Sequence, residues 1–234
     1  MRTLNIARLS FALAALIAPL SALAQARTPA PLPGASTRTG NAPTVRREDW
    51  QRVPDIFTAL GAKPGSRIAD LGAGEGWLTT RLARHVGPSG RVFAVDIDAG
   101  ALTRLSEKLA KDTLRHVEIV LAEDDDPRLP FGTLDGVVIL NAYHEVTKRV
   151  PVLEGVRRGL KPGGVLVIVD NFPTDSLWSR QEQVSRHGLA MAFARDDLEA
   201  QGFEIVSTTS NFIDHNNGDH RQRQWMIVAR RGSK

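Results

Sequence analysis

The chain has no cysteine among its 234 residues and a single tyrosine, Tyr143. Without cysteine it can form no disulfide bond, thiolate nucleophile, zinc–thiolate site or lipidated N-terminal cysteine. Acidic residues are missing before Glu48, whereas that segment holds six of the 30 basic residues. The rest of the chain therefore carries 24 basic and 26 acidic residues, a net charge of −2. The net positive charge of the whole chain therefore comes from the segment before Glu48. The sequence contains no basic stripe interleaved with aromatic residues, so nucleic-acid binding is not predicted.

Long apolar runs are also missing, apart from a short one near the N-terminus. Residues 1–24 predict a secretory signal peptide. Arg2 and Arg8 precede an apolar stretch over residues 11–23, and Ala22-Leu23-Ala24 matches a cleavage site. An uncleaved membrane anchor and a mitochondrial transit peptide are the alternatives. The apolar stretch is too short to span a bilayer comfortably, and its compactness disfavours a transit helix. We expect a periplasmic or secreted protein, cleaved after Ala24, with no stable membrane anchor after cleavage.

The remaining sequence divides into a linker and one domain. Residues 25–47 are rich in Pro, Ala, Thr and Gly without apolar periodicity, which predicts a disordered linker. Residues 48–234 are enough for one α/β domain with a single core. That domain begins with a predicted helix over residues 48–60, where Pro54 either kinks the helix or marks its first turn.

The most informative stretch is residues 67–86. A short apolar segment over 67–71 predicts a buried strand, and apolar residues at four-residue spacing predict a helix over 77–86. Between them, every second residue from Gly72 to Gly76 is glycine. Glycine permits positive φ and lets a ligand approach bare backbone. A strand that feeds a helix through such a turn directs backbone N–H groups at a ligand above the sheet edge.

A second apolar strand, residues 91–96, ends in Asp96, 20 residues after Gly76. An acid at the tip of the second strand accepts hydrogen bonds from both hydroxyls of a ribose, so a nucleoside derivative is the expected ligand. The turn has the spacing G-x-G-x-G, with Trp77 where the dinucleotide fingerprint has its third glycine. This spacing disfavours an NAD-dependent oxidoreductase.

Residues 70–76, Asp-Leu-Gly-Ala-Gly-Glu-Gly, and residues 92–98, Val-Phe-Ala-Val-Asp-Ile-Asp, resemble motifs I and II of class I S-adenosylmethionine-dependent methyltransferases. Residues 160–170 resemble the turn and fifth strand of the same family. The resemblance covers most of residues 48–230. It implies an S-adenosyl-L-methionine-dependent methyltransferase with a doubly wound, Rossmann-like α/β fold. Its mostly parallel seven-stranded sheet would end in an antiparallel strand pair, here residues 203–209 and 224–229 joined by a polar connection.

The resemblance also implies the residues that bind the cofactor. The glycine turn would hold the carboxypropyl part, Asp70 the amino group and Asp96 the ribose. Ile97 would pack on the adenine face, or else be ordinary core, and Glu123 or Asp124 would recognise the adenine amino group. The full predicted set is Asp70, Gly72, Ala73, Gly74, Gly76, Asp96, Ile97, Glu123, Asp124 and Asn141.

Two clusters of polar residues remain open to other interpretations. The four acids of residues 123–126 could bind a metal or form a solvated turn, but one loop rarely supplies convergent ligands, so no metal is predicted. Residues 141–145, Asn-Ala-Tyr-His-Glu, follow the strand predicted over 134–140, at the edge where ligands bind. There His144 is the candidate general base, with Tyr143 beside it as a second catalytic candidate. Alternatively, His144 and Glu145 cap the next helix and Tyr143 packs beneath it.

His187, the methyl acceptor and the leader leave further alternatives open for the methyltransferase hypothesis. His187 is predicted as an exposed helix-end residue, or as part of a lid over the substrate pocket. The methyl acceptor is expected to be a small molecule, with protein or lipid open, and the sequence does not predict the oligomeric state. Because S-adenosylmethionine is made in the cytosol, an exported enzyme would need its own supply. An exported domain of this fold that binds a nucleoside without catalysis is therefore the alternative, and a leader that is never used is another.

Overall fold

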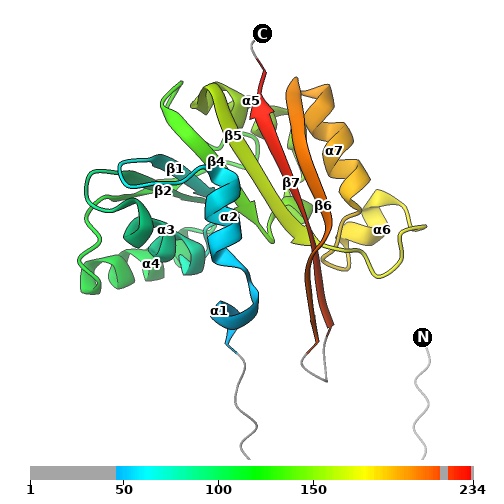
Figure 1. Cartoon of the computed structure of the whole chain (residues 1–234), viewed down its shortest axis with the longest axis horizontal. Helices are drawn as coiled ribbons and strands as arrows, with labels where there is room; N and C mark the ends of the chain where they lie inside the picture. The colour runs from blue at the N-terminus through cyan, green and yellow to red at the C-terminus, as the bar shows by residue number, and fades with distance from the viewer. Residues whose placement is uncertain (1–45, 217–220, 233–234) are drawn as a thin grey trace, which may run out of the picture. The chain divides into compact units, whose positions relative to one another are not determined.

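The computed structural model describes residues 46–216 and 221–232, so the predicted signal peptide and nearly all of the predicted linker lie outside the described residues. These two described ranges form a seven-stranded sheet flanked by helices (Figure 1). None of their helices combines the length and the apolar character that crossing a membrane requires.

The sheet has the strand order β3-β2-β1-β4-β5-β7-β6. Strands β1 to β5 pair in parallel, and β7 lies antiparallel between β5 and β6. This arrangement confirms the predicted doubly wound fold with its terminal antiparallel pair. The strands are β1 Arg67–Leu71, β2 Arg91–Asp96, β3 Val117–Leu121, β4 Leu134–Leu140, β5 Leu160–Asn171, β6 Phe203–Asn216 and β7 Arg221–Arg231.

Helices bury both faces of the sheet, which is why its inner strands are continuous apolar runs. Apolar side chains of α2, α3 and α4 cover one face, and those of α5 and α7 cover the other. In the described ranges the helices are α1 Arg47–Trp50, α2 Val53–Leu60, α3 Trp77–Val86, α4 Ala99–Lys111, η1 Tyr143–Glu145 (a short 3-10 helix), α5 Arg149–Gly159, α6 Arg180–Val184 and α7 Met191–Ala200.

Two predicted boundaries are wrong. The helix expected over residues 48–60 is two helices, because Arg52 adopts φ +52° and a new helix starts at Val53 with Pro54 in its first turn. The final strands are longer than expected, since residues 211–216 and 221–223 of the predicted polar connection extend the β6–β7 pair. Cross-strand hydrogen bonds between the two strands satisfy the backbone of these polar residues, which the side-chain pattern alone does not reveal.

The connection from β3 to β4, residues 122–133, contains no helix. It packs directly on α5, since a Cβ added at Gly155 would lie 2.7 Å from the ring of Pro127. β3 is an edge strand of the sheet, and its last residue, Leu121, is 46% exposed. The loop, rather than a helix, forms one wall of the space above the carboxyl ends of the strands.

Candidate functional site

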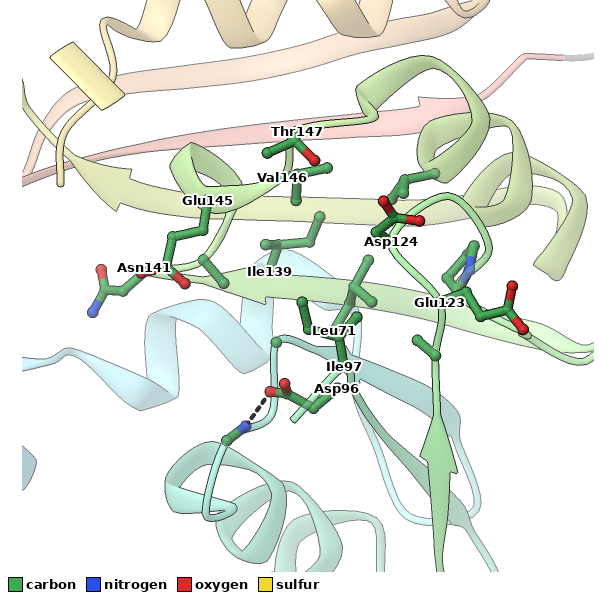
Figure 2. Close-up of a pocket in the computed structure, with 16 residues that line it drawn as sticks. Leu71, Asp96, Ile97, Glu123, Asp124, Ile139, Asn141, Glu145, Val146 and Thr147 are labelled. Carbon is green, nitrogen blue, oxygen red and sulfur yellow. Dashed lines mark hydrogen bonds between the residues drawn. The ribbon is translucent and has the colours of Figure 1, made fainter. Parts of the chain in front are cut away.

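A cavity of about 270 Å³ opens at the carboxyl ends of β1, β2 and β4. Figure 2 shows residues from the glycine turn, the tip of β2, the loop after β3 and the segment after β4 around it. A second cavity of about 430 Å³ adjoins the first, and both are lined by Gly72, Gly74 and Asn141. The glycine turn therefore lies between the two spaces.

These cavities bring together most of the predicted cofactor-binding residues. The first cavity is lined by Gly72, Gly74, Asp96, Ile97, Glu123, Asp124 and Asn141. Ala73 lines the second cavity. Asp70 and Gly76 line neither and lie beneath the turn, with Asp70 only 2% exposed. Because parallel strands end at one edge of the sheet, residues far apart in sequence converge here.

The three glycines of the turn have positive φ, at +81° for Gly72, +52° for Gly74 and +75° for Gly76. A Cβ at Gly72 would lie 2.4 Å from the Cβ of Ala142, and one at Gly76 would lie 2.2 Å from the Cδ1 of Leu105. Gly74 is different, because nothing lies within 4 Å of its Cβ position. Gly72 and Gly76 thus allow the turn to pack closely, while Gly74 presents bare backbone to the cavity.

Asp96 is anchored by backbone N–H groups at both of its oxygens. Its Oδ2 accepts a hydrogen bond of 2.7 Å from Gly74, drawn in Figure 2, and its Oδ1 accepts one of 2.9 Å from Asp98. Each carboxylate oxygen has a further lone pair, so the group can still accept hydrogen bonds from hydroxyls in the cavity. The neighbouring Ile97 is 64% exposed and lines the cavity, so it lies outside the core.

The acids after β3 are neutralised by nearby cations of the chain. Glu123 pairs with Arg128, and Lys148 Nζ lies 3.0 Å from Asp124 and 3.3 Å from Asp125. Glu123 therefore pairs with one cation, while Asp124 and Asp125 share another, Lys148.

Asp70 is a buried acid beneath the glycine turn. Its carboxylate accepts a hydrogen bond of 2.6 Å from the Thr79 hydroxyl. Burial raises the pKa of Asp70 to about 6; the Thr79 hydrogen bond opposes the rise, the charge of Asp96 adds to it, and Arg47 lowers it. A cationic group brought near would favour the ionised form of this acid.

Arg47 is a site residue that the sequence did not indicate. It begins α1, where the linker was predicted to end, and it lines the second cavity. Its guanidinium lies 4.0 Å from the centre of the Trp77 ring, and its Nε donates a hydrogen bond of 3.0 Å to Gln51. Burial lowers the pKa of Arg47, the charge of Arg81 lowers it further, and Asp70 raises it. The residue supplies a cation suited to a carboxylate in this cavity.

A chain of amide side chains ties α1 to the site. Gln51, which is fully buried, donates a hydrogen bond of 2.7 Å to Gln224 on β7. Gln224, also fully buried, donates to Asn141 at 2.6 Å and to Asn171 at 3.2 Å. Asn141 adopts φ +57° at the point where both cavities meet. This network fixes Asn141, and single amide residues carry no sequence signal that could have revealed it.

His144 is 3% exposed and is held by Asp170 through two hydrogen bonds of 2.7 Å, one from its backbone N–H and one at Nδ1. Burial lowers the pKa of His144, but the hydrogen bond and charge of Asp170 outweigh it and leave the pKa above its ordinary value. With Nδ1 donating to Asp170, the neutral ring carries its lone pair at Nε2. Within the described residues, this buried Nε2 has no hydrogen-bond partner.

Tyr143 is fully buried, and its hydroxyl donates a hydrogen bond of 2.8 Å to Asp197. Burial raises the pKa of Tyr143 above its usual range, and the charge of Asp197 adds to the effect. The hydroxyl lines neither cavity. The structure thus places Tyr143 in the packing arrangement that was the alternative, and its catalytic role stays a prediction.

Comparison with known proteins gives this site a context. Residues 68–164 match the family described as "Methyltransferase domain". The chain is 35% identical over 133 residues to the ubiquinone/menaquinone biosynthesis C-methyltransferase of Stutzerimonas stutzeri strain A1501, covering 56% of this chain and 51% of that protein. The chain therefore spans about half the length of the curated relatives it matches.

Solved structures share the fold. A SAM-dependent methyltransferase from Aquifex aeolicus superposes with a TM-score of 0.66 at 23% identity, covering 79% of this chain and 92% of that one. Phosphoethanolamine N-methyltransferase 2 from Haemonchus contortus, solved with S-adenosyl-L-methionine, gives a TM-score of 0.64 at 15% identity over 79% of this chain and 53% of that one. At these identities the likeness establishes the architecture alone, because one fold supports many chemistries.

Proposed function

We propose that the chain is an S-adenosylmethionine-dependent methyltransferase acting on a small molecule, because it has the fold of class I methyltransferases and its residues 68–164 match the methyltransferase-domain family. The observation that carries this proposal is the hydrogen bond of 2.7 Å between Gly74 and Asp96 at the cavity. It makes the bare backbone of the turn and a ribose-binding carboxylate one rigid unit.

The residues present fit this cofactor. Asp96 keeps free lone pairs for the ribose hydroxyls, and exposed Ile97 offers an apolar surface to the adenine ring. Glu123 lines the same cavity and, although its carboxylate pairs with Arg128, is the residue proposed to recognise the amino group of adenine. Arg47 lines the second cavity and would bind the carboxylate of the amino-acid tail there, while the charge of Asp70, buried beneath the turn, would favour its cationic amino group.

When bound, the cofactor supplies a methyl group already activated on a sulfonium, so the protein contributes mainly alignment and exclusion of water. Asn141 stands between the two cavities and is held by Gln224, which suits it to position the reacting groups. A general base is needed only if the acceptor must lose a proton. His144 remains the predicted base: Asp170 leaves its Nε2 without a hydrogen bond among the described residues, but this nitrogen is buried and His144 lines neither cavity.

A small-molecule acceptor is supported by the relatives and by the charge of the domain. The relatives at about 35% identity are C-methyltransferases of ubiquinone and menaquinone biosynthesis, and these quinones are small molecules. The net charge of −2 after residue 47 also provides no general attraction for nucleic acid. Which small molecule is methylated is a question for labelled-cofactor screening of extracts.

We further propose that the leader directs export to the periplasm or the exterior. Its support is the arrangement of Arg2, the apolar stretch and the small residues up to Ala24. Mass spectrometry of the chain recovered from fractionated cells should find Gln25 as the first residue. An intact leader on protein in the cytosolic fraction would contradict export and remove the conflict with cofactor supply.

Calorimetry on the full chain tests the central proposal. S-adenosylmethionine and S-adenosylhomocysteine should both bind, and NAD should not. Binding of NAD alone would overturn the proposal. Binding of the two S-adenosyl compounds without methyl transfer to any component of an extract would favour the non-catalytic nucleoside-binding alternative.

A further inference from the structure

Two imidazoles and one carboxylate meet beside the first cavity. The Oε1 of Glu145 lies 3.6 Å from Nε2 of His144 and 3.8 Å from Nδ1 of His187. One donor atom from each of the three residues lies within 4.8 Å of the others. Glu145 lines the first cavity (Figure 2), so one member of this cluster stands at the cavity wall.

Hydrogen bonding does not account for this arrangement. The separations of 3.6 and 3.8 Å are too long for hydrogen bonds between these atoms. His144 is 3% exposed, yet its Nε2 has no partner among the described residues. A buried polar atom without a partner costs about 1–3 kcal/mol, and in a native structure it calls for an explanation.

A metal ion explains the spacing. Zn²⁺ binds imidazole nitrogen and carboxylate oxygen at about 2.0–2.2 Å in tetrahedral geometry, which puts neighbouring ligand atoms roughly 3.3–3.6 Å apart. The separations of 3.6 and 3.8 Å from Glu145 are at or slightly above that range, and the ligand nitrogens of the two histidines lie within 4.8 Å of each other. Small side-chain movements of the exposed Glu145 and His187 would complete the geometry.

Asp170 gives the cluster the outer support that metal-binding histidines usually have. Its fully buried carboxylate accepts a hydrogen bond of 2.7 Å at Nδ1 of His144. This bond fixes the ring orientation and leaves the Nε2 lone pair directed at the cluster. A second bond of 2.7 Å from the backbone N–H of His144 holds the residue in place.

His187 reaches the cluster from a constrained backbone. It adopts φ +56°, an uncommon conformation for a residue other than glycine. Its carbonyl accepts a hydrogen bond of 3.3 Å from the Asn171 side chain, and a Cβ at the following Gly188 would lie 2.7 Å from the carbonyl oxygen of Phe172. The segment after β5 therefore sets the position of the His187 backbone, which is an outlier of the kind found at functional sites.

We propose that His144, Glu145 and His187 bind a divalent first-row metal ion, for which Zn²⁺ is the best match to two imidazoles and one carboxylate. Three protein ligands leave at least one coordination position open, and Glu145 places the ion at the cavity wall. If the chain is the proposed methyltransferase, its acceptor would be a small molecule with an oxygen that ligates the ion. This inference rests on the proposed function. The ion would use the lone pair of His144 that a general base would otherwise need.

The metal site can be tested without the cofactor. The full chain is stripped with a chelator and then titrated with Zn²⁺ by calorimetry, and with Co²⁺ by visible absorption. One equivalent of Zn²⁺ should bind, and His187→Ala and Glu145→Gln should each weaken binding at least tenfold. Both side chains are exposed, so both variants should fold normally by circular dichroism. His85→Ala is the matched control, because this exposed histidine bonds to Ala62 on the other side of the sheet and should not affect binding.

Two outcomes would overturn the metal site: no binding of Zn²⁺, or binding that is equally tight in the wild-type chain and in His187→Ala. Either outcome would leave His144 with the predicted role of a base. S-adenosylmethionine binding is measured separately on the same samples. Loss of cofactor binding with Zn²⁺ binding intact would defeat the proposed function and the acceptor class, while the metal site would stand.

Discussion

The backbone N–H of Gly74 donates a hydrogen bond of 2.7 Å to Oδ2 of Asp96. The carboxylate at the tip of β2 therefore holds the turn that follows β1, although the two residues are 22 positions apart. One side chain thus has two tasks, since it fixes the conformation of the turn and faces the first cavity.

Asp96→Ala should remove both contributions at once. We expect the affinity for S-adenosylmethionine to fall about 100-fold, since hydrogen bonds to a charged group contribute roughly 1.5–3 kcal/mol. Calorimetry measures the change. Asp98→Ala is the control, because Asp98 caps α4 through two backbone N–H groups and should cost about 1 kcal/mol of stability while leaving the affinity intact. Equal affinities for Asp96→Ala and the wild-type chain would remove the ribose assignment.

Gly72→Ala tests the close approach of the turn to the segment after β4. The new Cβ would lie 2.4 Å from the Cβ of Ala142, on a backbone with φ +81°. We expect a loss of roughly 2–4 kcal/mol in urea unfolding, from left-handed strain and overpacking together. Gly163→Ala separates the two causes, because Gly163 has φ +75° with nothing within 4 Å of its Cβ position. That control should lose only about 1 kcal/mol, and a similar loss in both variants would contradict the steric argument.

Asp70 should make stability depend on pH between about 4 and 6. Burial raises its pKa from 3.8 to about 6 in the folded chain, with Asp96 adding to the rise and Thr79 and Arg47 opposing it. Between these values the folded state keeps a proton that the unfolded state has lost, so stability falls as the pH rises through this window. The cost of ionising the buried acid is fully present above pH 6 and amounts to roughly 3 kcal/mol.

Asp70→Asn removes that cost while keeping an acceptor for the Thr79 hydroxyl. The variant should be more stable than the wild-type chain at pH 7, and the difference should disappear near pH 4. Urea unfolding of both proteins at several pH values gives this difference free of other titrating groups. The affinity of Asp70→Asn for S-adenosylmethionine should fall as well, because the amino group of the cofactor loses an anionic neighbour. A stability difference that does not change with pH would show that Asp70 does not titrate in this range.

The parts of the fold that could be predicted from the sequence are those where one local pattern decides the outcome. The bounds expected for the strands over residues 67–71, 91–96 and 134–140 match the structure, because a strand covered on both faces is a continuous apolar run. The convergence of the glycine turn with Asp96 follows in the same way, since parallel strands end at one edge of the sheet.

What could not be predicted depends on contacts between distant segments. His144 meets Asp170 across 26 positions, and Gln51 meets Gln224 across 173. Residues of these types occur throughout loops and helix ends, so no spacing identifies them before the fold is known. His187 is exposed as expected, but its proximity to Glu145 appears only when the segment after β5 is placed beside η1.

The bond between Gln51 and Gln224 should couple α1 to the proposed cofactor site. Both amides are fully buried, so replacing either one by alanine leaves the other without its partner and should cost about 1–3 kcal/mol in urea unfolding. The double variant should cost less than the sum of the two single variants, because each single change already breaks the same bond. Gln222→Ala is the control, since Gln222 is only partly buried and bonds to Asn171 instead.

Gln51→Ala should also weaken S-adenosylmethionine binding, because Gln51 accepts the hydrogen bond that orients Arg47 at the second cavity. Strictly additive losses, together with unchanged affinity in Gln51→Ala, would mean that α1 packs against the domain without contributing to the site.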